Sequence, residues 1–161
     1  MAIRYTALFV LFASGSLAAY IFKGKFSRAV AAEEEIIRLI DHIRNKIMYF
    51  SEPIEDIYSS FECDVLSETG FTETAFEHGW ESAVDLLKNN SVITEGFADS
   101  IREFGEKLGS LFTEEEINNC NYYISRGTEQ LEKDKLELPK KSKLYSTFSI
   151  AGSLLIAVML F

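Results

Sequence analysis

Four side chains in this sequence are of types that commonly bind metals or act as nucleophiles: Cys63, Cys120, His42 and His78. The cysteines lie too far apart for a CxxC motif, and the histidines form no pair at metal-ligand spacing. This pattern argues against a structural zinc site. Cys120 falls on the apolar stripe of its segment, which predicts a reduced, buried thiol. A domain that faced outward would instead favour a disulfide.

The carboxylates are numerous, but their pattern does not predict catalysis. The sequence contains no P-loop and no GxGxxG, HExxH or GxSxG motif. An acid–base pair needs two carboxylates held in one cleft in unlike environments, whereas these fall on the solvent faces of predicted helices. We therefore predict no enzymatic activity, no catalytic residue, no bound metal and no cofactor.

The charge of the chain bears on its partners. The formal net charge is −9, with acidic residues in every predicted helical segment. Binding to phosphate backbones requires a clustered basic face, so a nucleic-acid partner is not expected. An acidic surface of this kind either aids solubility or offers a face to a basic partner.

Both ends of the chain are apolar. The runs Tyr5–Phe22 and Leu144–Phe161 contain no charged side chain. As a helix, 18 residues at about 1.5 Å each extend roughly 27 Å, close to the hydrocarbon thickness of a bilayer. We predict an N-terminal transmembrane helix or signal-anchor over residues 1–24, a soluble domain over residues 25–142 and a C-terminal transmembrane helix over residues 143–161.

The first apolar run has an alternative interpretation as a cleavable signal, although its apolar end argues against cleavage. Cations near membrane segments stay cytoplasmic, so their positions predict the orientation. The cations that flank the two runs on the domain side outnumber the single Arg4 on the other: Lys23, Lys25, Arg28, Lys140, Lys141 and Lys143. The central domain should be cytoplasmic, and cleavage would reverse this prediction.

The central domain shows apolar residues at spacings of three and four, which predict amphipathic helices. The first helix spans Arg28 to Phe50, with Ile36, Ile40 and Ile47 on its apolar stripe and Glu33 to Glu35 on the other face. Ser51-Glu52-Pro53 ends it and begins a second helix, because proline disfavours helix before it and suits a first turn.

Three further helices follow a polar stretch around residues 64–74. The third carries Trp80 and stops at Asn89-Asn90, and Thr94 caps a fourth that ends near Gly109. Thr113 to Glu116 fits a capping box for a fifth helix, which fades around residues 136–139. No segment alternates with a period of two. The predicted fold class is all-α, an antiparallel helical bundle of about five helices flanked by two transmembrane helices.

Several short motifs occur in a characteristic order. They are Ile47-Met48-Tyr49 followed by Pro53-Ile54, Trp80-Glu81-Ser82-Ala83, Phe104-Gly105-x-x-Leu108-Gly109, and Lys143-Leu144-Tyr145 before the last apolar run. With its two apolar ends, the chain resembles the stage III sporulation protein AB family over nearly its whole length. The candidates for packing or for docking a partner are Tyr49, Pro53, Trp80, Phe104, Gly105, Leu108 and Gly109.

These candidates have two interpretations each. Trp80 is expected in the core with its N–H bonded nearby, whereas an exposed tryptophan would anchor an interface. Gly105 would let a neighbouring helix come close and Gly109 would close its helix. The alternative is that residues 104–109 form a docking surface.

The resemblance implies a helical domain similar to the cytoplasmic domains of type II secretion and type IV pilus platform proteins. It implies a noncatalytic platform or adaptor subunit of the channel complex between mother cell and forespore, located in the mother-cell membrane around the forespore. The implied partners are other subunits of the stage III sporulation complex, including its cytoplasmic ATPase, the AA protein of the same operon. A homo-oligomer is left open.

Two other functions remain open from the sequence. One is a membrane-anchored regulator or adaptor unrelated to sporulation. The other, which follows if the first apolar run is cleaved, is a binding module with an extracytoplasmic domain.

Overall fold

The computed structural model describes residues 2–50, 54–106, 108–110 and 112–159. Within them, the side chains at 2–23, 50, 54, 55, 59, 142, 145, 146, 149, 150 and 153–159 lie outside the description. The chain divides into two compact units, one formed by residues 28–134 and the other by residues 1–27 with 135–161. The first unit contains the bundle and all candidate sites.

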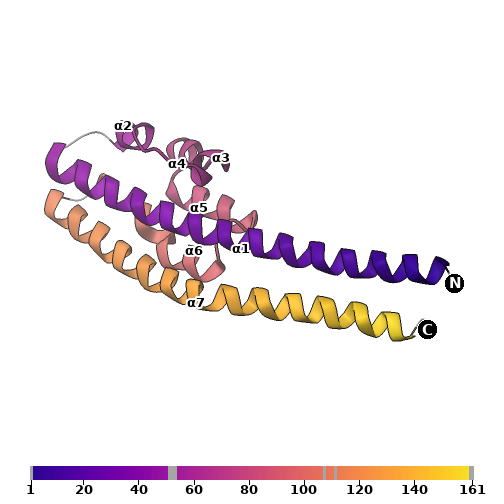
Figure 1. Ribbon diagram of the computed structural model, residues 1–161. Coiled ribbons are helices and arrows are strands. Elements are labelled where there is room, and N and C mark those ends of the chain that lie inside the picture. Colours follow the sequence, from indigo (N-terminus) through magenta and orange to yellow (C-terminus); the bar gives the residue numbers. More distant parts are fainter. Residues whose placement is uncertain (1, 51–53, 107, 111, 160–161) are drawn as a thin grey trace. The chain divides into compact units, whose positions relative to one another are not determined.

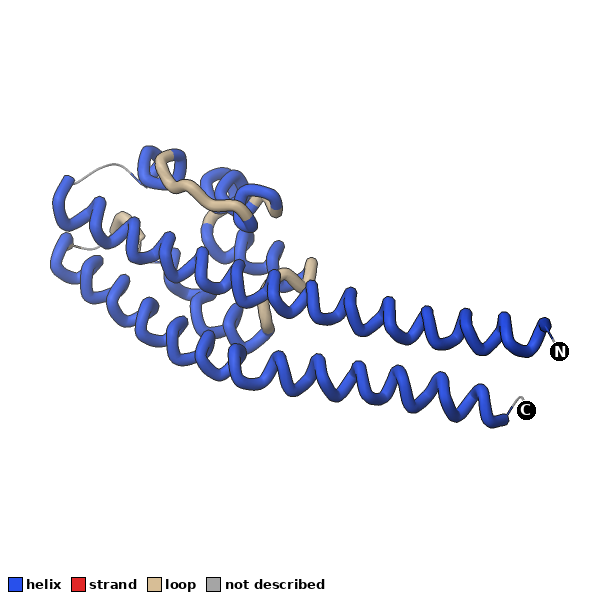
Figure 2. Tube along the Cα trace, viewed as in Figure 1, coloured by secondary structure: helices blue, strands red, loops and turns tan. Residues whose placement is uncertain are grey.

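The described residues form helices joined by loops and turns and include no strand (Figure 2). The all-α fold class is therefore confirmed. The helices in chain order are α1 (Ala2–Phe50), α2 (Ile54–Ser59), α3 (Val65–Glu68), α4 (Phe71–His78), α5 (Trp80–Asn89), α6 (Glu95–Ile101), the 3-10 helix η1 (Arg102–Glu106) and α7 (Thr113–Met159).

Within the unit of residues 28–134, the parts of α1 and α7 that belong to it run alongside each other in opposite directions (Figure 1). A hydrogen bond of 2.9 Å from Arg44 Nη1 to Asn121 Oδ1 joins the two helices. The predicted stripe of α1 is buried, with Ile36, Ile40 and Ile43 fully inaccessible to solvent. Cys120, Tyr123 and Leu131 of α7 and residues of the shorter helices supply the rest of the core.

The structure corrects the predicted number and length of the helices between α1 and α7. A short helix, α3, lies within the stretch predicted to be polar and irregular, and the predicted third helix is two helices, α4 and α5. Gly79 separates them with φ 86° and ψ 164°, a conformation that only glycine adopts readily. The predicted fourth helix tightens after Ile101 into η1.

Several predicted helix ends are confirmed. The Thr94 hydroxyl accepts the backbone N–H of Phe97 and so caps α6. α5 ends at Asn89 with Asn90 as its cap. The predicted cap and start of the second helix, Ser51 and Pro53, lie outside the described residues.

Two predictions about α7 are wrong. The Glu116 carboxylate accepts the backbone N–H of Gly109 at 2.5 Å, four residues before the Thr113 amide that a capping box would use. The helix also does not fade around residues 136–139 but continues through Pro139 to Met159. Proline removes one backbone hydrogen bond and kinks a helix, yet the flanking residues keep helical geometry here.

The two predicted transmembrane helices fall largely on residues whose side chains are outside the description. Across the described part of the chain, no helix has a stretch that is both long enough and apolar enough to cross a bilayer. The spans at residues 1–24 and 143–161 therefore gain no support from the structure, and the division at residues 25–142 stays a prediction.

Candidate functional site

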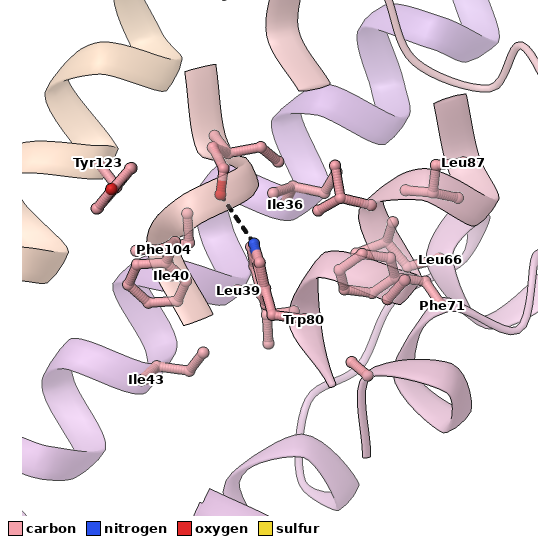
Figure 3. Packing of buried hydrophobic residues seen from close by; sticks show 14 of the residues in the cluster. Ile36, Leu39, Ile40, Ile43, Leu66, Phe71, Trp80, Leu87, Phe104 and Tyr123 are labelled. Atoms are coloured by element: carbon pink, nitrogen blue, oxygen red, sulfur yellow. Dashed lines mark hydrogen bonds between the residues drawn. The ribbon is translucent and has the colours of Figure 1, made fainter. Parts of the chain in front are cut away.

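Trp80 joins the aromatic residues of the core, at the first position of α5. Its indole Nε1 donates a hydrogen bond of 2.9 Å to the carbonyl oxygen of Ile101 (Figure 3). Its ring meets Phe71 and Phe104 edge to face, with centroids 5.3 and 4.8 Å apart, a favourable aromatic arrangement. Trp80 is thus a core residue with a bonded N–H, as predicted.

Gly105 lies directly against Trp80. A Cβ atom placed on Gly105 would be 2.2 Å from Cβ and 2.8 Å from Cγ of Trp80. Carbon atoms in contact are normally about 3.5 to 4.0 Å apart, so no other residue fits without a shift of the backbone. The glycine therefore allows η1 to approach α5, which is the close-packing role that the sequence predicted.

A shallow groove of about 260 Å³ opens beside this contact. Its lining is mostly apolar and comes from α2, α4, α5, η1 and the residues after η1. Phe76 at its edge is 58% exposed, which is unusual for so large an apolar side chain. The groove is lined by Tyr58, Ala75, Phe76, Gly79, Trp80, Gly105 and Leu108.

A larger and more polar pocket of about 680 Å³ adjoins the groove, because Tyr58 lines both. It contains two carboxylates, Glu62 and Asp64, and one cation, Arg38. The rest of its lining is Tyr58, Phe61, Cys63, Ser67 and Thr72.

The start of α3, which forms one side of this pocket, is held by Glu35 of α1. The Glu35 carboxylate accepts the backbone N–H groups of Asp64, Val65 and Leu66 at 2.9 to 3.2 Å. An anion is favourable at a helix N-terminus, where these N–H groups have no partner within the helix. The prediction that Glu35 faces solvent is wrong, since the residue is buried.

Glu33 of α1, also predicted to face solvent, is fully buried and lies at a cluster that joins three helices. Its Oε1 accepts the backbone N–H of Thr94 at 2.9 Å and lies 2.8 Å from the Thr94 hydroxyl. The same hydroxyl lies 2.7 Å from Oδ2 of Asp134 on α7. Oε2 of Glu33 is buried and has no hydrogen-bond partner among the described residues.

Burial raises the pKa of Glu33 to about 7, and the charge of Asp134 adds to the rise, although the two hydrogen bonds from Thr94 oppose it. The Thr94 hydroxyl has one hydrogen and two carboxylates within reach. It can donate to only one of them, and a protonated Glu33 would supply the second hydrogen bond by donating to the hydroxyl oxygen.

The described residues offer little else for chemistry. They include no group of three or more His, Cys, Asp or Glu side chains placed to hold a metal ion. Both cysteines are free thiols, and burial raises the pKa of Cys120 to about 11 and raises that of Cys63. A protonated thiol is a poor nucleophile. His42 packs against Phe61, with the two ring centroids 5.4 Å apart and the ring planes tilted by 49°.

Comparison with known proteins identifies the family. The family model for stage III sporulation protein AB matches residues 4–161. The chain belongs to the stage III sporulation protein AB family. It is therefore a sporulation-related protein, and the resemblance predicted from the motifs is confirmed. Neither the curated proteins nor the solved structures include a match.

Three motif residues that suggested the stage III sporulation protein AB family meet at the groove: Trp80, Gly105 and Leu108. Phe104 is buried behind them. The other two described candidates are not part of the groove lining. Tyr49 is exposed on α1, and Gly109 has φ 81° and donates its N–H to Glu116. Pro53 lies outside the described residues.

The charge of this family member is divided sharply between its two units. Residues 28–134 contain nine Lys and Arg against 24 Asp and Glu, a net charge of −15. The remaining residues carry the balance of +6, with seven Lys and Arg and one Glu. Some cations of the acidic unit are already paired within it. Arg102 meets Glu81 and Asp85, and Lys88 meets Glu95 and Asp99.

Proposed function

We propose that this protein is a noncatalytic platform subunit of a sporulation channel complex, and that its helical unit docks other subunits. The observation that carries the proposal is membership of the stage III sporulation protein AB family over residues 4–161. The resemblance of that family to secretion and pilus platform proteins supports the role, as an argument from fold alone. On this proposal the partners are other stage III subunits, among them the cytoplasmic ATPase.

The surface of the unit supports docking rather than catalysis. The two pockets formed by described residues are open depressions at the surface, and the buried cluster around Glu33 joins helices of the unit. The groove beside Phe76 is lined by apolar residues, and the pocket that adjoins it contains charged ones, a combination that is common at protein-binding sites. The surplus of carboxylates favours partners with basic surfaces, because opposite charges speed and orient their encounter.

We further propose that the two apolar ends anchor the subunit in the mother-cell membrane around the forespore. The backbone of Tyr5–Phe22 lies within α1 and that of residues 144–159 lies within α7, and cations flank the two runs on the side of the acidic unit. Membrane fractionation tests this anchoring. The full-length protein should sediment with membranes and require detergent for release, and recovery in the aqueous fraction without detergent would refute it.

The side of the membrane can be tested with a single exposed cysteine. Glu73→Cys, in a chain with Cys63→Ser and Cys120→Ser, places one thiol on the exposed face of α4. An impermeant thiol reagent should label it only after the cells are permeabilised. Labelling in intact cells would place the unit outside the cytoplasm and remove the proposed contact with a cytoplasmic ATPase.

The platform role itself requires two results. Deletion of the gene in a spore-forming host should block sporulation at the stage when mother cell and forespore communicate. The purified full-length protein in detergent should also crosslink to the stage III ATPase, and not to an unrelated ATPase of similar size. Normal sporulation after deletion would refute a platform role.

A further inference from the structure

Three features of the groove beside Phe76 together point to a particular kind of ligand. The first is its lining, in which Phe76, Trp80 and Leu108 present apolar surface in an open depression. Phe76 is exposed to solvent although its neighbour Ala75 is in the core. The described part of the chain therefore leaves apolar surface in water, which is unfavourable.

The second feature is the charge around the groove. Glu62 and Asp64 line the adjoining pocket, and Tyr58 forms the wall that the two depressions share. Glu73 lies three residues before Phe76 on α4, so the two side chains are neighbours on one helix face. The apolar groove therefore lies beside a carboxylate of α4 and next to a pocket that contains two more.

The third feature is the supply of cations within the unit. Among the described residues that line either depression, Arg38 is the one cation, and it already lies 3.7 Å from the buried Glu35. With a net charge of −15, the unit has no surplus of its own cations to neutralise these carboxylates. A ligand that brings positive charge together with an apolar side chain would match both the groove and the carboxylates beside it.

We propose that the groove docks a basic amphipathic segment of a partner protein. A large apolar side chain of that segment packs between Phe76, Trp80 and Leu108. Its lysines or arginines lie along Glu62, Asp64 and Glu73. This inference rests on the proposed platform function and names the docking surface and the chemistry of the partner. A nucleic acid or an anionic lipid surface would be repelled by the same carboxylates.

The first test uses a fluorescently labelled synthetic peptide that forms an amphipathic helix, with leucines along one face and lysines along the other. It is mixed with the full-length protein in a neutral detergent. Empty micelles serve as the blank. The peptide should bind to the protein above the blank and bind more weakly as salt is added, because charge pairs contribute. A peptide with the same lysines but serine in place of leucine should bind at least about tenfold more weakly, since it lacks the apolar anchor.

Variants locate the binding surface. Phe76→Glu and Glu73→Lys should each weaken binding by about tenfold, the size of a typical hot-spot effect. Both residues are exposed, so neither substitution disturbs the core. Phe112→Glu and Glu115→Lys are matched controls at exposed positions on or before the first turn of α7, away from the groove lining, and should leave affinity within about twofold.

Three outcomes would overturn the proposal. One is equal binding of the leucine and serine peptides, which would indicate attraction to acidic surface alone. Another is an equal loss with Phe112→Glu and with Phe76→Glu. The third is failure to bind peptide combined with a dimer that Phe76→Glu dissociates, which would make a second copy the occupant.

Failure of this proposal can be told apart from failure of the platform function by using Phe76→Glu in sporulating cells. If deletion blocks sporulation but Phe76→Glu supports it fully, the platform role stands and the groove is not its docking surface. If deletion leaves sporulation intact while the peptide still binds through Phe76, the groove is a docking site for a partner outside the proposed complex.

Discussion

At the scale of single residues, the packing of the core depends on close contacts that a larger side chain would disrupt. The contact of Gly105 with the Cβ of Trp80 fixes how closely η1 approaches α5. The hydrogen bond from Trp80 to the carbonyl of Ile101 ties the start of α5 to the end of α6. The groove proposed as a docking site is therefore shaped by residues whose first role is packing.

Gly105→Ala should destabilise the protein by about 1 to 3 kcal/mol, because the added methyl group would overlap Trp80. Urea unfolding followed by the fluorescence of Trp80, the one tryptophan of the chain, measures this. Gly127→Ala is the matched control, since its Cβ would lie 3.4 Å from Ile37, an ordinary contact. It should be neutral, or stabilising by up to about 1 kcal/mol through helix propensity. Equal effects of the two substitutions would contradict the packing argument.

Glu33 makes stability depend on pH. Its pKa is about 7 in the folded protein against an ordinary 4.5, so the folded state binds more protons between these values. The free energy of unfolding should therefore fall as pH rises from 4.5 to 7 and level off outside this window. The full change is about 3 kcal/mol if the whole shift is expressed.

Glu33→Gln tests this assignment, because glutamine keeps an oxygen for the Thr94 amide but does not titrate. The difference in unfolding free energy between the variant and the wild type should shift in favour of the variant as pH rises from 4.5 to 8. Urea unfolding at several pH values measures it. A difference that does not change with pH would mean that Glu33 is not the titrating group.

At the scale of helices, a carboxylate from one element organises another. α3 has four residues, too few to be stable alone, and Glu35 of α1 binds the N–H groups at its start. The wall of the polar pocket that α3 provides therefore depends on a side chain about 30 residues earlier in the chain.

Glu35→Gln should loosen α3 without unfolding the bundle, because it removes the charge and one of the two acceptor oxygens. The expected cost is about 1 to 2 kcal/mol, similar to the loss of a helix cap. Hydrogen exchange at the Val65 and Leu66 amides should become faster. Glu73→Gln, the same change at an exposed position of α4, is the control and should leave those two amides unaffected.

The helices that were predictable are those whose signals are local. The apolar stripes of α1 and α7, the Thr94 cap and the stop at Asn90 all follow from residues within one or two turns. The break at Gly79 was not predictable, because a glycine is compatible with a helix interior and with a left-handed turn alike. The continuation of α7 through Pro139 was missed for a similar reason, since proline weakens a helix without always ending it.

The candidate site was only partly predictable. Trp80, Gly105 and Leu108 were identified from motifs, and the structure brings them to one groove. Phe76 was not among the residues singled out from the sequence, although the structure exposes it at the groove. The burial of Glu33 and Glu35 was missed because their partners lie 61 residues away at Thr94 and about 30 residues away in α3.

At the scale of the whole molecule, charge is the dominant feature. The acidic unit carries a net −15 within 107 residues, and such self-repulsion opposes a compact state. The other unit is basic. A chain with this division of charge should respond strongly to ionic strength.

Added salt should raise the stability of the protein. The Debye length falls from about 30 Å at 0.01 M to about 8 Å at 0.15 M, so repulsion across the acidic unit is screened over this range. Thermal unfolding at increasing sodium chloride should show a rising midpoint. A double variant, Glu114→Lys with Glu115→Lys, lowers the net negative charge and should gain less from salt. A midpoint that falls with salt would show that attractive ion pairs outweigh the repulsion.

The buried thiol of Cys120 makes it possible to measure how often the helical unit opens locally. Its sulfur is shielded and protonated, so an alkylating reagent reaches it only in molecules whose packing between α7 and the core has come apart. With Cys63 replaced by serine, the rate of alkylation would report how often this local opening occurs. A bound partner that stabilises the packed unit would lower the rate of Cys120 alkylation. A partner that favours the open form would raise it.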